Sequence, residues 1–168
     1  MEEQTGFLVT LENTGIGTAI REGATAFPWI ESIHVLAVAL VFGSIALVDL
    51  RLIGYGSHRN SVARLIKELV PVTWVGFALA VLTGGALFLS NASMYWDSVP
   101  FKLKMGALAL AGANMMAFHF GGTYRAIAQW DETMPPPAAA RRAGYLSLAI
   151  WTVVMFLGRW IGFSAPFV

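Results

Sequence analysis

Two histidines, His34 and His119, fall inside long apolar segments of this 168-residue chain. The chain has no cysteine, which excludes disulfides, iron–sulfur clusters and thiolate metal sites. An imidazole in lipid-embedded sequence is costly to bury, and ionisable residues there usually line a functional site or pair with another polar group. We therefore expect the chemistry of this protein to be centred on these two side chains.

The first histidine has a carboxylate neighbour on the same helix face. Glu31 and His34 are three residues apart, a spacing that brings side chains together on a helix. Such a pair can bind a metal ion directly, or the carboxylate can orient an imidazole that does so. The alternative is that Glu31 lies in water and His34 only bonds a backbone carbonyl. Depth favours a ligand, because His34 lies about 7 Å below Trp29 at 1.5 Å per residue.

The second histidine belongs to a stripe of residues at intervals of seven. Met105, Gly112 and His119 place a thioether, a flat glycine surface and an imidazole along one side of a helix. A porphyrin between helices needs room for its ring and an axial nitrogen. The alternative is ordinary close packing through small residues, an ambiguity shared by the 83–85 Thr-Gly-Gly segment. The stripe is a candidate haem site, with His119 also a candidate metal ligand.

The two histidines are expected to lie at different depths. His34 lies about five residues into its helix and His119 about fifteen, a difference of roughly 15 Å. Axial nitrogens on one iron are only about 4 Å apart. The spacing therefore favours two haem sites, one near each membrane face, over one shared iron.

Three cationic side chains are candidates for pairing with haem propionates. Lys104 and Arg159 fall near the outer end of their segments, and Arg125 falls near the inner end. Cations within lipid need a partner. A pairing of Arg159 with Glu31 is an equally good alternative to a propionate.

The composition predicts an all-α membrane protein. Hydrophobic residues make up 57% of the chain and charged residues 12%, about half the usual charged fraction. Four segments are long enough to cross a bilayer, which takes about 20 apolar residues each; they are about 28–53, 69–90, 103–124 and 145–163. The short connections predict one membrane domain over 1–168, an up-down four-helix bundle. Residues 1–27 are expected to include a short interfacial helix.

The loop charges predict the orientation in a bacterial inner membrane. Seven basic residues lie between segments one and two or three and four, against three on the other side: Arg51, Arg59, Arg64, Lys67, Arg125, Arg141 and Arg142 against Arg21, Lys102 and Lys104. Basic loops stay in the cytoplasm, so both termini are expected in the periplasm. A net charge of +1 without a basic patch argues against nucleic-acid binding.

Several motifs carry a resemblance that extends over nearly the whole chain. They are Phe27-Pro-Trp-Ile-Glu-Ser-Ile-His34, Val48-Asp-Leu-Arg-Leu-Ile-Gly54, Phe118-His119-Phe and Gly158-Arg-Trp160. The chain resembles a family of small bacterial inner-membrane proteins without an assigned function. More remotely, it is similar to the cytochrome b561 and copper-resistance D-type proteins, whose paired histidines hold two b haems. This chain has too few histidines for that. The second axial position of each iron would therefore be filled by Met105 or by a neighbouring protomer, or would stay open.

These observations predict a membrane b-type cytochrome that binds one or two haems b and carries electrons within or across the membrane, as an oxidoreductase or an electron-transfer subunit. One alternative is a protein that binds copper or another divalent ion through Glu31 and His34. Another is a structural or assembly protein without a cofactor. Besides the bilayer, the expected partners are a periplasmic electron-transfer or metal-carrier protein and further copies of the chain, because small residues promote association in lipid.

Overall fold

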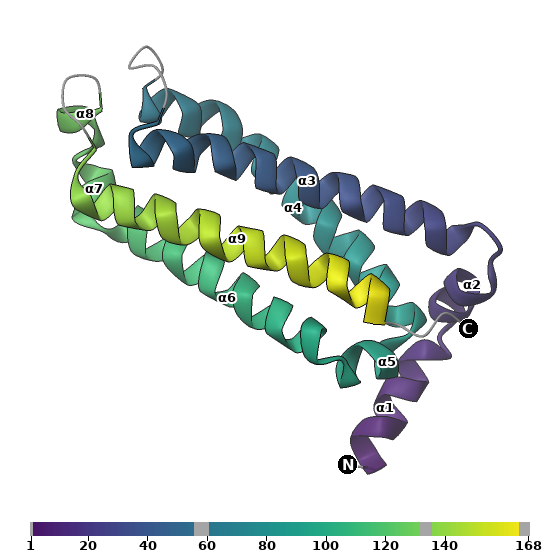
Figure 1. The fold of residues 1–168 in the computed structure, drawn as a ribbon. Coiled ribbons are helices and arrows are strands. Elements are labelled where there is room, and N and C mark those ends of the chain that lie inside the picture. Colours follow the sequence, from purple (N-terminus) through teal and green to yellow (C-terminus); the bar gives the residue numbers. More distant parts are fainter. Residues whose placement is uncertain (1, 56–60, 132–135, 165–168) are drawn as a thin grey trace.

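The computed structural model describes residues 2–55, 61–131 and 136–164, and within these ranges the chain is all-α (Figure 1). The helices in chain order are α1 Glu2–Glu12, α2 Gly15–Glu22, α3 Ala26–Ile53, α4 Val62–Ser90, α5 Ala92–Asp97, α6 Val99–Phe120, α7 Gly122–Arg125, α8 Ile127–Trp130 and α9 Ala138–Ser164. α1, α2 and α5 gather at one end of the long helices, here named the α5 end. α7 and α8 lie at the other, the α8 end (Figure 1).

Three of the long helices are long and apolar enough to cross a membrane. In the described part of the chain these are α3, α4 and α9, which supports the prediction of a membrane protein. Large apolar side chains on them are exposed, as lipid contact requires; Leu36, Leu82 and Phe156 are examples. The fourth expected segment forms α6, whose 22 residues are long enough but which is not among the three. It carries two lysines in its first two turns and is rich in alanine and glycine.

The helix boundaries differ from the expected segments where capping groups act. α4 begins at Val62 rather than near residue 69, because the Ser61 side chain accepts a hydrogen bond from the Arg64 N–H and starts the helix early. α6 ends at Phe120 rather than near residue 124. Two consecutive glycines follow it, and glycine destabilises a helix interior.

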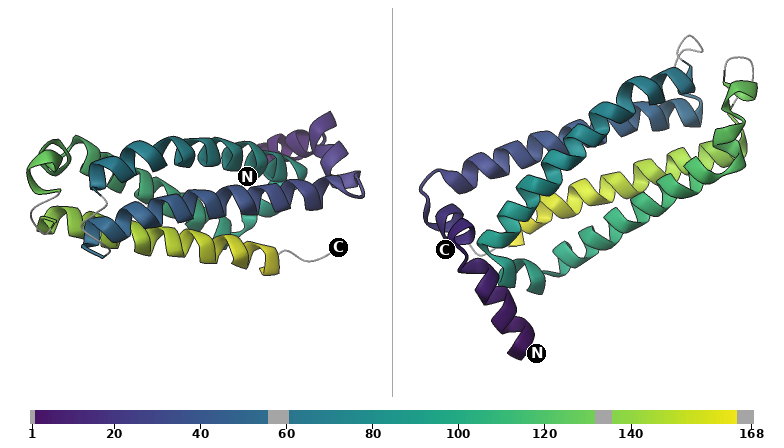
Figure 2. Two further views of the ribbon diagram at one scale, coloured as in Figure 1. Left: turned by 90° about the horizontal axis from the view of Figure 1, so that it is seen from above. Right: turned by 180° about the vertical axis from the view of Figure 1, so that it is seen from behind.

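The long helices form an open row rather than a closed bundle. α3 packs along both α4 and α9, and α6 packs along α9, giving the order α4, α3, α9, α6. α4 and α6 are connected by α5 and diverge from it (Figure 2). Within the described ranges their backbones do not approach each other closely. The expected up-down connectivity is present, but the closed four-helix bundle is not.

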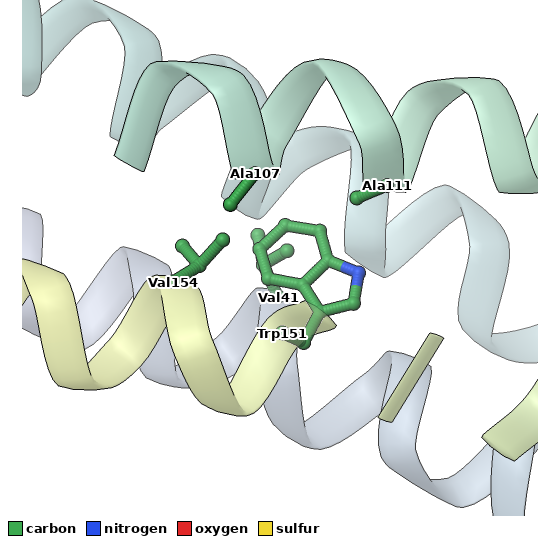
Figure 3. Packing of buried hydrophobic residues seen from close by; sticks show 5 residues of the cluster. All are labelled: Val41, Ala107, Ala111, Trp151 and Val154. Carbon is green, nitrogen blue, oxygen red and sulfur yellow. The ribbon is translucent and has the colours of Figure 1, made fainter. Parts of the chain in front are cut away.

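The core midway along the row depends on one large ring between small residues. Trp151 of α9 is buried in one cluster with Ala107 and Ala111 of α6, Val41 of α3 and Val154 (Figure 3). The alanines leave the width that an indole needs between two helices. This cluster joins α3, α6 and α9 and fixes how they face one another.

The amino-terminal segment forms two helices where the sequence predicted one. They are separated near Thr14, whose side chain accepts a hydrogen bond from the Gly17 N–H and caps α2. Two polar contacts fasten the segment to the α5 end, through Ser90 and Ser93, and a third joins α2 to α1. The Arg21 side chain donates to the carbonyl oxygens of Glu12 and Ser90, each at 3.2 Å, and the Ser93 N–H donates to the Glu12 carboxylate at 2.6 Å.

Candidate functional site

His34 lies on α3 near the α5 end and faces α4. Its ring is half-buried, and its Nδ1 lies 3.0 Å from the Thr83 hydroxyl oxygen. That hydroxyl has a single hydrogen, which it donates to the Leu79 carbonyl at 2.7 Å. With that hydrogen on the Leu79 carbonyl, the Thr83 oxygen accepts from the ring and Nδ1 carries the proton. The ring also hydrogen-bonds the Ala80 backbone. In this tautomer of the neutral imidazole, Nε2 carries the lone pair.

A glycine on α4 makes room for the ring. A Cβ placed on Gly84 would lie 2.9 Å from Cε1 of His34 and 3.4 Å from its Nδ1, closer than side chains tolerate. The imidazole therefore lies against bare backbone. Thr83 and Gly84 act as a pair, in which one residue orients the ring and the other admits it.

Lys104 of α6 lies near the His34 ring, close enough for its charge to act on it. The Lys104 Nζ lies 3.4 Å from the position that a Cβ on Gly158 of α9 would occupy. Of the ion pairs found in the described ranges, none involves Lys104. Four helices thus converge on what we call the His34 site: His34, Thr83, Gly84, Lys104 and Gly158.

An aromatic cluster lies at the α5 end. Tyr95 of α5 packs against Phe88 and Phe101, with ring centroids 6.3 and 5.7 Å away. Burial raises the pKa of the Tyr95 hydroxyl, and the nearby negative charge of Glu31 raises it further. The exposed Glu31 side chain therefore lies close to this cluster.

The expected metal site is incomplete in the part of the chain that the structure describes. No group of three or more histidine, aspartate or glutamate side chains there could hold a metal ion. Glu31 and His34 by themselves offer two ligands. Any metal ion held by this pair would need further ligands from water or from another molecule.

His119 lies at the opposite end of the row. It occupies the last turn of α6, is exposed, and stacks on Tyr124 of α7 with ring centroids 4.0 Å apart. It is 15 residues beyond Lys104 on one helix, or about 22 Å at 1.5 Å per residue. Since Lys104 is near His34, the two histidines of one chain are too far apart to share an iron.

The other expected site residues are mostly on the surface. Met105, Arg125 and Arg159 are exposed, and Gly112 has open space where a Cβ would lie. The Arg159 guanidinium lies 4.5 Å from the centre of the Phe163 ring, a cation–π contact. Lys104 and Met105 face different ways because adjacent helical residues are about 100° apart. Of the three candidates for binding a haem propionate, Lys104 is the one that lies near a histidine, His34.

Sequence reasoning missed what Thr83 and Gly158 do. The Thr-Gly-Gly pattern is visible in the sequence, but it does not reveal that its hydroxyl faces His34. Gly158 appeared only as part of a family motif. A polar residue followed by glycine within an apolar segment is the signal that could have indicated a partner for a buried histidine.

Comparison with known proteins identifies a family but no activity. A family of unknown function (DUF6644) matches residues 11–164. No curated protein and no solved structure matches the chain. The resemblance to a family without an assigned function is thereby confirmed. The remoter similarity to the cytochrome b561 and copper-resistance D-type proteins receives no support.

Proposed function

The chain belongs to this family of unknown function, and we propose from its His34 site that it is a membrane protein that binds haem b and transfers electrons. In this proposal His34 would be the residue that binds the haem iron. The observation that carries it is the contact of His34 Nδ1 with the Thr83 hydroxyl, which itself donates to the Leu79 carbonyl, so that Nε2 is the nitrogen available to a ligand.

This arrangement is the one that a metal-bound histidine needs. A ligating imidazole usually donates its other ring N–H to a neighbouring acceptor, which fixes the ring and makes the ligating nitrogen more basic. The Thr83 hydroxyl, itself anchored to the Leu79 carbonyl, therefore supports a ligand role for His34.

The charge near His34 suits a haem. Lys104 supplies a cation that lacks an ion pair among the described residues. A haem propionate would provide the missing negative charge, since an unpaired ammonium is costly in a membrane. The haem, when bound, supplies a one-electron couple. The protein residues would hold the iron through His34, orient that ring through Thr83 and bind a propionate through Lys104.

One haem per chain is the form of the proposal that the geometry favours. His119 is exposed and stacked on Tyr124, so a haem there would need a second protein surface to enclose it. A neighbouring copy of the chain could provide that surface, with Met105, Gly112 and Arg125 along the same side of the protein. The number of haems would then depend on the oligomeric state.

The proposal includes α6 as a fourth membrane helix. α6 runs antiparallel to α9 and packs along it, so if α9 crosses the bilayer, α6 lies at the same depth. Its lysines would sit near the α5 end. With the basic loops of the α8 end in the cytoplasm of a bacterium, the α5 end and both termini face the periplasm.

The absorption spectrum of the purified protein tests the proposal. Wild type, expressed with an adequate haem supply, should be red with a Soret band that shifts on reduction. His34→Ala should insert normally but lose this band, since neither water nor a thioether replaces an axial nitrogen well. His119→Ala is the matched control and should keep it. A colourless wild type, or a full band in His34→Ala, overturns the proposal.

A divalent metal ion is the second candidate for the same ring nitrogen of His34. Glu31 lies one turn from His34 on α3, and imidazole with carboxylate is compatible with copper. Metal analysis of a colourless protein, compared with Glu31→Gln and His34→Ala, would distinguish this function from a structural role without a cofactor.

A further inference from the structure

A second polar group lies within the helix row, at the contact between α3 and α9. Asp49 of α3 is 5% exposed. Ser147 of α9 is buried too and hydrogen-bonds its side chain. The helices meet closely here, because a Cβ on Gly144 of α9 would lie 2.9 Å from the Asp49 carbonyl oxygen. The Asp49 side chain is therefore buried beside a close contact of the α3 and α9 backbones.

One oxygen of the Asp49 carboxyl group, Oδ2, is buried and lacks a hydrogen-bond partner. No cation neutralises the group either, since the ion pairs found in the described ranges are Arg51 with Asp131 and Arg64 with Glu68.

The remaining charged groups at this end of the adjoining helices point outward. They are Lys67 of α4 and Arg141 and Arg142 of α9, and all three are exposed. From α6, the side chain near this level is the neutral Asn114, which donates to the Ala143 carbonyl at 3.1 Å.

A charged carboxylate cannot be accommodated here without a partner. An isolated buried charge costs far more than a neutral polar group, and such groups neutralise instead. We propose that Asp49 is a proton-binding site within the membrane domain, which holds one proton as a carboxylic acid. On loading, the carboxylate takes a proton from hydronium and leaves one water molecule. This inference does not depend on haem at the His34 site.

Proton release from this site would affect the packing of α3 on α9. Ionisation would place an uncompensated negative charge beside Ser147, close to where the α3 and α9 backbones meet at Gly144. Water or a cation would have to enter, or the two helices would have to separate. Proton occupancy and the α3–α9 contact are therefore coupled.

Aspartate labelling tests the site in the intact protein. The chain has three aspartates, Asp49, Asp97 and Asp131, so selective ¹³C labelling of their carboxyl carbons gives a simple NMR spectrum in detergent or lipid. At neutral pH one signal should be that of a neutral acid and two those of carboxylates. Asp49→Asn should remove the acid signal, and Asp97→Asn should leave it. Three carboxylate signals, or an acid signal that survives Asp49→Asn, overturns the proposal.

Two further measurements keep the test decisive. If Asp49→Asn fails to fold, the infrared spectrum of the wild type can be measured instead. It should contain the C=O band of a protonated carboxylic acid. Ser147→Ala should shift the frequency of that band by removing its hydrogen bond. A carboxylate signal that moves when sodium replaces choline in the buffer would instead identify a cation site and count against proton binding.

Discussion

The His34 ring lies flat against the backbone of α4 at Gly84, where a Cβ would lie 2.9 Å from Cε1. The same ring is held in its plane by the Thr83 hydroxyl at 3.0 Å. Two adjacent residues of α4 thus determine where a histidine of α3 can point. Because each can be changed separately, the contribution of space and the contribution of hydrogen bonding can be measured independently.

Gly84→Ala tests the contribution of space. The added methyl group would push the ring away from Thr83, and overpacking of this kind typically costs about 1–3 kcal/mol. We expect a lower unfolding temperature and a reduced haem content per mole of purified protein.

Gly85→Ala is the matched control for this change. A Cβ there meets no atom within 4 Å, and alanine favours a helix over glycine by up to about 1 kcal/mol. The control should therefore retain its haem and be equally or more stable. Equal haem content in Gly84→Ala and Gly85→Ala would contradict the role of Gly84.

Thr83→Val tests the hydrogen bond while preserving the shape of the side chain. Without the hydroxyl, His34 Nδ1–H loses its acceptor, and losing such an orienting group typically weakens metal binding about 10–100-fold. Thr83→Ser should restore the affinity, because it retains the hydroxyl. Haem titration of the apoprotein, followed at the Soret band, measures the difference. Valine and serine variants of equal affinity would exclude an orienting role for Thr83.

Glu31→Gln should lower the pKa of Tyr95, but not to its ordinary value. The negative charge of Glu31 is the smaller cause of the raised pKa and burial the larger, so burial alone should keep it raised. A raised tyrosine pKa stabilises the fold below about pH 10, the ordinary value, and this contribution is lost as the pH rises through the folded-state pKa. Alkaline titration of phenolate absorbance, with Tyr95→Phe to assign the signal, measures the shift. An unchanged pKa in Glu31→Gln would show that the two groups are not neighbours.

Hydropathy and helix spacing were sufficient to predict the apolar helices and the candidates within them. Apolar runs of this length have few alternatives to membrane helices, and a polar residue within one is conspicuous, which is why His34 and Lys104 could be selected. That Lys104 turns inward while Met105 is exposed depends on the rotation of α6 about its axis. The alanines that face Trp151 help to set this rotation, and such a long-range contact is not visible in local sequence.

The ends of the helices were harder to predict for the same reason. The first turns of α4 carry Arg64, Lys67 and Glu68 and resemble a loop in composition. They are helical with the help of the Asp131 carboxylate, 69 residues from Val62, which accepts the Val62 and Ala63 N–H groups. A cap supplied from so far along the chain has no local signature. The interpretation of the 83–85 segment was left open because the sequence does not show which residue of α3 lies opposite.

Single cysteines can test both the orientation and the fourth membrane helix, since the chain has none of its own. Gln4→Cys should react with an impermeant reagent in intact cells, and Tyr55→Cys, at an exposed position between α3 and α4, should not. Trp96→Cys and Gln129→Cys, both at exposed positions, bracket α6. If α6 crosses the bilayer, the first of these reacts and the second does not. Reaction of both would leave α6 outside the membrane, and reversed labelling of all four would invert the topology.

Two ion pairs at the α8 end differ in burial, which decides how much each contributes to stability. Arg51 and Asp131 are buried at 3.8 Å, and Arg64 and Glu68 are exposed at 2.8 Å. The shorter pair is the weaker one in energetic terms, because exposed pairs four residues apart on a helix contribute about 0.3–0.5 kcal/mol. Asp131 also caps α4 through both carboxylate oxygens, 2.5 and 2.9 Å from the Val62 and Ala63 nitrogens.

Asp131→Ala should therefore destabilise the protein much more than Glu68→Ala. Loss of a helix cap alone costs about 0.5–2 kcal/mol, and breaking a buried pair by removing one partner adds up to about 3–5 kcal/mol. The Asp131 main-chain carbonyl, which accepts from Arg51 at 2.8 Å, remains in the variant and limits the loss. We expect a loss of at least about 2 kcal/mol for Asp131→Ala and under about 0.5 kcal/mol for Glu68→Ala, measured by reversible unfolding in mixed detergent micelles. Similar losses in the two variants would mean that Asp131 does not hold α4 to the end of α3.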